Sequence, residues 1–136
     1  MYARIIVAVD LGNMEQCKTL LDKAVQLIDA GGEIRLLHAL EEVPSYIAAE
    51  LPRDLSDRRR AEARMELKTL AGGVDARIEV EVRTGAASGQ ILQSAEDSNA
   101  DLIMIASHKP GLSDYFIGST AARVVRHAQT SVLILR

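Results

Sequence analysis

Short apolar runs with strand-like composition alternate with helix-like segments from one end of the chain to the other. The runs at residues 3–9, 34–40, 77–82, 102–106 and 131–135 are rich in Val, Ile and Leu, as strands are. In the segments between them, apolar residues recur every three or four positions, as on one face of a helix. Because strands that alternate with helices favour a parallel sheet with right-handed crossovers, the sequence predicts an open five-stranded α/β fold with helices on both faces.

Four helices are expected between these strands. Gly31 and Gly32 are expected to end the first helix, and the second is expected over residues 55–71. Ser88 is expected to cap the third helix and Ser119 to open the fourth. The residues expected to point inward are, helix by helix, Cys17, Leu20, Leu21, Ala24, Val25 and Ile28; Ala63, Leu67 and Leu70; Ile91, Leu92 and Ala95; and Ala121, Val124, Val125 and Ala128.

The strand order follows from the two most apolar runs, residues 3–9 and 102–106. Strands buried on both faces belong in the middle of a sheet, so placing these two side by side gives the order 3-2-1-4-5. The winding direction then reverses between strands 1 and 4, and ligands bind at the carboxyl ends of the strands at such a switch point. No repeat, low-complexity tract or linker is present in the sequence, so residues 1–136 are expected to form a single Rossmann-like domain.

Charge and composition argue against several classes of partner. The formal net charge is −3, which does not favour nucleic acid, because phosphate backbones need clustered Lys and Arg. The apolar run at residues 5–9 is too short for a signal peptide, and no run approaches membrane-spanning length. The single cysteine, Cys17, rules out an internal disulfide and is expected to be a core residue. We therefore expect a cytoplasmic protein with no nucleic-acid partner and no membrane insertion.

The loop after the fourth strand ends at the start of a helix, at Gly118-Ser119-Thr120. Free backbone N–H groups at a helix start attract anions, and Gly118 would let a phosphate approach without meeting a side chain. The alternative reading is a serine cap preceded by a turn glycine.

At the first strand, Asp10 is placed to bind a ribose hydroxyl or to help hold Mg²⁺ beside phosphates, unless it is only a loop or cap carboxylate. Backbone groups of Val9 and Ala39 at strand ends are suited to reading the edge of an adenine ring.

Several stretches together resemble the universal stress protein family. They are residues 5–10, Leu37-His38-Ala39, Gly85, residues 100–108, Gly118-Ser119 and residues 124–128. The resemblance covers essentially the whole chain. It implies a fold like that of the adenine nucleotide alpha hydrolases, ATP or AMP bound at the Asp10 loop and the loop after strand 4, a regulatory role in the stress response and homodimers.

The chain departs from the family pattern of Gly-x-x-Gly, nine residues, then Gly-Ser. Ala106 and Lys109 stand at the first two glycine positions, Gly111 lies nearby, and Gly118-Ser119 matches. Lys109 is either a phosphate contact or a solvated loop lysine, and the Ser-His-Lys-Pro version resembles an ATP-binding subgroup. The nucleotide-binding residues that we expect are Ala8, Val9, Asp10, Ala39, Ile105, Ser107, His108, Lys109, Gly111, Gly118, Ser119 and Thr120, with Mg²⁺ held at Asp10 through the phosphates.

The last strand predicts how two copies would meet. In the order 3-2-1-4-5 it is an edge strand, yet the run Val132-Leu133-Ile134-Leu135 has no charge or proline to protect it. Antiparallel pairing of this strand with its own copy across a two-fold axis would satisfy the edge. The alternative is that the last helix and a loop cover it within one chain.

Three other functions compete with nucleotide-dependent regulation. A phospho-accepting receiver domain would need an acidic pair after the first strand and an acceptor Asp after the third, where this chain has Asp10-Leu11 and Arg83-Thr84-Gly85. A dimeric adaptor without nucleotide is the second. A slow ATP hydrolase is the third, and no base paired with a nucleophile is found for it; His108 borders the site, whereas His38 and His127 are expected to be structural. No catalytic residue is therefore predicted.

Overall fold

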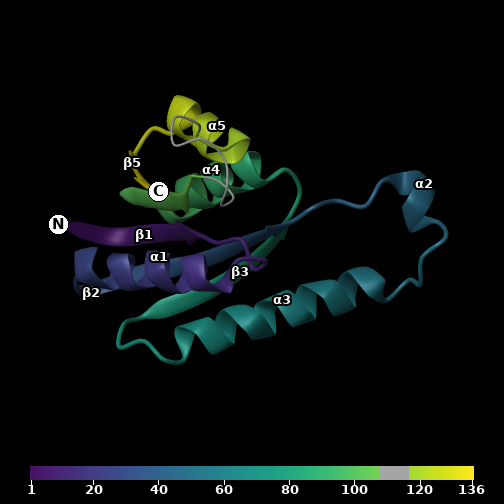
Figure 1. Ribbon diagram of the computed structural model, residues 1–136, viewed down its shortest axis with the longest axis horizontal. Helices are drawn as coiled ribbons and strands as arrows, with labels where there is room; N and C mark the ends of the chain where they lie inside the picture. Colours follow the sequence, from purple (N-terminus) through teal and green to yellow (C-terminus); the bar gives the residue numbers. More distant parts are fainter. Residues whose placement is uncertain (108–116) are drawn as a thin grey trace.

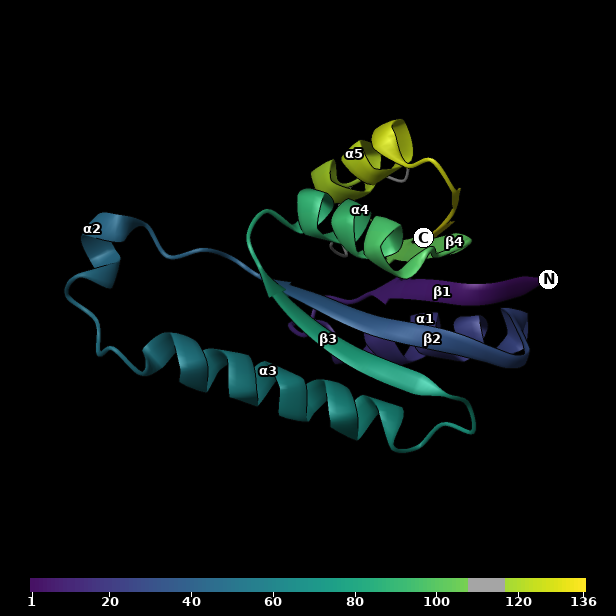
Figure 2. The ribbon, with the colours of Figure 1, turned by 180° about the vertical axis from the view of Figure 1, so that it is seen from behind.

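The computed structural model of the protein describes residues 1–107 and 117–136. These residues form one parallel sheet in the order β3-β2-β1-β4-β5, and Figures 1 and 2 show the sheet from opposite sides. The strands are β1 (Tyr2–Ala8), β2 (Ile28–Leu40), β3 (Ile78–Thr84), β4 (Leu102–Ala106) and β5 (Ser131–Leu135). The fold class and strand order expected from the sequence are confirmed.

The helices lie on both faces of the sheet. They are α1 (Met14–Leu27), α2 (Ser45–Ala48), α3 (Leu55–Ala71), α4 (Ala87–Ser98) and α5 (Ser119–His127). Helices α1 and α3 lie on one face and α4 and α5 on the other, as the two opposite views in Figures 1 and 2 show. No helix within the described residues is both long enough and apolar enough to cross a membrane.

The central strands are buried on both faces, as their composition predicts. In β1, Ile5 and Val7 pack into the core beneath α1 and α3, whereas Ile6 and Ala8 pack into the core beneath α4 and α5. Strand β4 alternates in the same way. The helix α3 has the expected bounds, and its inward residues Ala63, Leu67 and Leu70 are buried.

The first helix ends earlier than the sequence predicts. Ile28 has extended backbone angles and pairs with Tyr2 as the first residue of β2. Gly31 and Gly32 lie within β2 at a register shift, where the pairing moves from Tyr2↔Ile28 to Arg4↔Glu33. Gly31 has φ +80°, and a side chain at Gly32 would meet the Ala3 carbonyl oxygen at 2.8 Å. The glycines therefore serve a bulge in the sheet and do not end the helix.

Three smaller expectations were also wrong or incomplete. Ser88 lies inside α4, because the N-cap is Ala86, which makes no side-chain cap bond. The side chain of Val125 is 48% exposed, because Ala121, Val124 and Ala128 form a narrower inward stripe on α5. The short helix α2 was not expected in the connection between the second strand and the second helix.

Candidate functional site

The carboxyl ends of β1 and β4 meet at the switch point of the sheet. Ala8 and Ile105 are paired in register on these neighbouring parallel strands. Both side chains are buried and apolar, so they form the floor of the candidate site. Asp10 follows two residues after Ala8 and is exposed. The structure therefore brings together two of the expected site segments.

The Asp10 loop is held by its own hydrogen bonds. Oδ1 of Asp10 accepts from the Gly12 N–H at 2.9 Å, and the Asp10 carbonyl accepts from the Asn13 N–H at 2.9 Å and from the Cys17 Sγ at 3.1 Å. Oδ2 of Asp10 accepts no hydrogen bond from residues 1–107 or 117–136. One carboxylate oxygen thus shapes the turn, and the other is left for a ligand. The described residues contain no ready-made cluster of acidic, His or Cys ligands for a metal.

Cys17 is a core residue, as the sequence predicts. Its side chain is 1% exposed. Burial first, and the nearby Asp10 charge second, raise the pKa of the thiol to about 11. A protonated, buried thiol is unsuited to nucleophilic chemistry.

Ser107 joins the end of β4 to the start of α5 and to β5. Its N–H donates to the Leu135 carbonyl at 2.8 Å, and its carbonyl accepts from the Gly118 N–H. Ser107 is 2% exposed. Among the described residues, the N–H groups of Ser119 and Thr120 have no hydrogen-bond acceptor. The start of α5 is therefore fixed against the switch point with donors left for an anion.

The backbone groups that were predicted to read the edge of an adenine ring are only partly available. The Val9 N–H donates to the Leu37 carbonyl at 2.9 Å, and the Val9 carbonyl accepts from the His38 Nδ1 at 2.9 Å. His38 thus ties the end of β1 to β2, in keeping with the structural role expected for it. Val9 has one carbonyl lone pair left, so Ala39 is the better-placed backbone for reading a base. His108, Lys109 and Gly111 lie outside the described residues.

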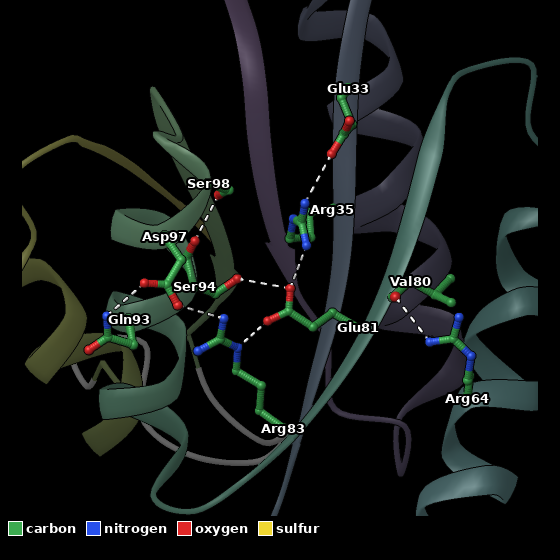
Figure 3. A network of polar contacts seen from close by, with 10 residues as sticks. All are labelled: Glu33, Arg35, Arg64, Val80, Glu81, Arg83, Gln93, Ser94, Asp97 and Ser98. Atoms are coloured by element: carbon green, nitrogen blue, oxygen red, sulfur yellow. Dashed lines mark hydrogen bonds and ion pairs between the residues drawn. The ribbon is translucent and has the colours of Figure 1, made fainter.

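A network of charged side chains that sequence reasoning missed lies between β2, β3 and α4 (Figure 3). Glu81 on β3 accepts from Arg35 at 2.8 Å and from Arg83. Arg83 also donates to Asp97 on α4 at 3.0 Å, and Ser94 Oγ lies 3.4 Å from Glu81. Glu81 is partly buried between Arg35 on the neighbouring strand and Ser94 on α4, whereas Arg77 and Glu79 on the same strand segment are exposed. Arg83 is paired in register with Ala39 on the neighbouring strand β2, so the network borders the candidate site.

Replacing Glu81 should destabilise the protein in a pH-dependent way. Burial alone would raise the pKa of the Glu81 carboxyl, but hydrogen bonds from Arg83 and Arg35 lower it below its ordinary value of 4.5. A lowered folded-state pKa contributes stability above the ordinary value, and this contribution is lost as the pH falls through the folded-state value. We expect Glu81→Gln to cost about 1–3 kcal/mol in urea unfolding at neutral pH, with the difference shrinking in acid.

Glu79→Gln, on the same strand but exposed, is the matched control and should change the unfolding free energy by less than about 0.5 kcal/mol. A Glu81→Gln variant as stable as the wild type at neutral pH would show that the network contributes nothing.

A separate groove of about 320 Å³ lies near the amino ends of β4 and β5. The groove is lined in part by the end of α4, with Glu96 and Asn99. It is also lined by the end of α5 and the turn after it, with His127 and Thr130. These residues precede β4 and β5, so the groove is remote from the carboxyl ends of the strands. It does not belong to the candidate site.

Comparison with protein families gives one match over the whole chain. The model of the universal stress protein family matches residues 1–136. Universal stress protein G of Shigella flexneri is 36% identical over 149 aligned positions that cover 100% of both chains.

Solved structures share the fold. The structure of the hypothetical protein MJ0577 has a TM-score of 0.82 at 23% identity and covers 99% of this chain and 96% of its own. A universal stress protein in complex with cAMP has a TM-score of 0.64 at 24% identity, covering 99% and 97%. The universal stress protein from Archaeoglobus fulgidus in complex with dAMP has a TM-score of 0.65 at 18% identity, covering 99% and 98%.

Proposed function

The chain belongs to the universal stress protein family, and on that premise we propose that it is a regulatory protein that binds ATP or AMP and acts as a homodimer. The observation that carries the proposal is the pairing of the end of β1, which leads into Asp10, with the end of β4, from which Ser107 hydrogen-bonds to Gly118 at the start of α5. Ligands bind to parallel α/β sheets at such points.

The start of α5 fits a phosphate group. The N–H groups of Ser119 and Thr120 lie at the positive end of the helix dipole, and Gly118 has no side chain to obstruct an anion. The Ser119 hydroxyl supplies a further donor. His108, Lys109 and Gly111 remain proposed members of this site.

The base would lie over small side chains. Ala8 and Ala39 at the ends of β1 and β2 leave room for a flat ring, and the Ala39 backbone is suited to reading its edge. The cAMP and dAMP in the two family structures share an adenine and a phosphate, which supports an adenine nucleotide as the ligand class. Whether ATP or AMP is the resident nucleotide is decided by the experiment below.

The proposal assigns regulation and not catalysis to this site. Asp10 is the acidic side chain placed beside the phosphates, and one of its oxygens is engaged in the turn. Without a base paired to a nucleophile, any hydrolysis of ATP should be slow. Cytoplasmic localisation stays a prediction.

Two measurements test the proposal. Chromatography of the supernatant from heat-denatured purified protein should show stoichiometric adenine nucleotide and identify it. Calorimetric titration of the nucleotide-free protein should give saturable binding of ATP or AMP. An empty extract together with no heat of binding would favour the adaptor without nucleotide.

Asp10→Ala should weaken ATP binding more in the presence of Mg²⁺ than with a chelator. If Asp10 helps to hold Mg²⁺ beside the phosphates, its loss should cost about tenfold in affinity with Mg²⁺ present, or about 1.4 kcal/mol. Calorimetric titrations with MgCl₂ and with EDTA measure the difference.

Asp10→Asn is the control, because its amide oxygen can still accept from the Gly12 N–H while the charge is gone. A metal role predicts that the Asn variant behaves like the Ala variant. Equal losses with and without Mg²⁺ would assign Asp10 to the ribose, and unchanged affinity would remove it from the site.

A further inference from the structure

The connection between β2 and α3 projects from the body of the molecule. Residues 41–54, which we term the strap, leave the sheet after Leu40 and lead into α3 at Leu55. The short helix α2 lies at the far end of the strap. Figures 1 and 2 both show the strap extending beyond the carboxyl edge of the sheet, the edge that carries the candidate site. No residue of the strap is buried.

The strap is nevertheless apolar in its middle. Val43, Tyr46, Ile47 and Leu51 lie within it, and the side chains of Tyr46 and Ile47 are 74% and 39% exposed. Such a group of apolar side chains on one projecting segment is a candidate contact surface.

The strap carries a short hydrogen-bonded turn and has a fixed origin. The Pro44 carbonyl accepts from the N–H groups of Ile47 and Ala48, so α2 is a compact turn that begins at a proline. At its root, the Leu40 carbonyl accepts from the Gly85 N–H at 2.9 Å, which fixes the point of departure from the sheet. Movement about this root would carry α2 as a unit.

The root of the strap adjoins the predicted position of the base. Leu40 follows Ala39 directly, and β2 pairs up to Leu37 with Ala8 of β1, whose end leads into Asp10. Tyr46 is six residues beyond Leu40, and a chain segment of that length spans at most about 20 Å. The phenol ring can therefore reach the space over Ala8 and Ala39.

We propose that the strap closes over a bound adenine nucleotide and packs Tyr46 against the face of its base. The inference rests on the proposed function and adds to it a side chain that would select for a flat aromatic base. Aromatic side chains stack on nucleic acid bases through their π-faces without needing a charged contact. Closure would also bury the apolar middle of the strap, which the monomer leaves exposed.

Tyr46→Trp provides a direct test, because the chain contains no tryptophan of its own. Addition of ATP or AMP should shift the emission of the introduced indole and change its intensity, and the change should saturate at the dissociation constant that calorimetry gives. Inorganic tripolyphosphate, which has phosphates but no base, should leave the emission unchanged.

Substitutions at the same position test its contribution to affinity. Tyr46→Ala should weaken ATP and AMP by the same factor of about ten, since the base is common to both. Tyr46→Phe keeps the ring and should bind like the wild type. Met65→Ala, at an equally exposed apolar residue on α3, is the matched control and should also bind like the wild type.

The outcomes separate this proposal from the function on which it rests. Wild-type protein that binds ATP in the calorimeter, with no fluorescence response in Tyr46→Trp and unchanged affinity in Tyr46→Ala, would overturn the strap and leave the proposed function standing. A change of mass in light scattering for Tyr46→Ala, with unchanged ATP affinity, would reassign the strap to an interface between copies. No binding of ATP or AMP by the wild type would remove the proposed function, and the strap proposal with it.

Discussion

Gly118→Val is expected to abolish ATP binding and leave the fold intact. The α5 helix begins at Ser119, and the orphan N–H groups of its first turn point toward the space beside Gly118. An isopropyl group at this position would occupy the volume that a phosphate needs. We expect affinity to fall by at least about a hundredfold, which corresponds to about 2.7 kcal/mol.

The backbone at Gly118 makes this a selective test. Its angles, φ −57° and ψ 155°, are open to any residue, so valine introduces no strain of the main chain. Its N–H can still donate to the Ser107 carbonyl. Loss of a good N-cap residue should lower stability by about 1 kcal/mol, which thermal unfolding would register as a small shift.

Gly118→Ala serves as the graded control, because one methyl group should weaken binding less than valine does. Unchanged affinity in the valine variant, measured by calorimetry on protein that unfolds cooperatively, would show that the phosphates are bound elsewhere.

The arrangement of the sheet could be predicted because its signal is strong and local. The two uniformly apolar runs that became β1 and β4 had to be covered on both faces, which placed them in the centre and fixed the switch point. The helix α3 was equally clear, since Ala63, Leu67 and Leu70 continue one stripe between a proline-containing connection and a glycine pair.

What could not be predicted depends on contacts between distant residues. Ile28 continues the apolar period of α1, so its pairing with Tyr2 is invisible until the strands are aligned. The Glu81 network could not be predicted, because Arg35 lies 46 residues away in the sequence and Ser94 comes close only when α4 packs over the sheet. In the site, the Val9 carbonyl looked free for a base, yet the His38 ring hydrogen-bonds to it across two strands.

The edge strand β5 is where two copies are expected to pair. Its side chains are half-buried, because Leu133 and Leu135 pack into one core and Val132 and Ile134 into the other. A lysine at these positions would therefore disturb the core as well as a dimer. The backbone offers a cleaner test, because the outer edge of the ladder is the part that the described residues leave unpaired.

The direction of the backbone groups in β5 can be worked out from one hydrogen bond. The Leu135 carbonyl accepts from the Ser107 N–H, so it points toward β4. Backbone groups alternate along a strand, so those of Leu133 also point toward β4, whereas those of Ile134 point to the free edge. Ile134→Pro would thus remove a donor from the intermolecular ladder and spare the bonds between β4 and β5.

Ile134→Pro is expected to convert the dimer into a folded monomer. Proline is tolerated in edge strands, and the loss of the isoleucine side chain from the core should cost about 1–3 kcal/mol. Light scattering should give the mass of a single 14.8 kDa chain, whereas a dimeric wild type would give twice that mass. Leu133→Pro, the matched variant, removes a donor that points toward β4 and should lower the unfolding temperature much more. A wild-type protein that is monomeric at micromolar concentration would remove the proposed dimer, whereas an Ile134→Pro variant that stays dimeric would place the interface elsewhere.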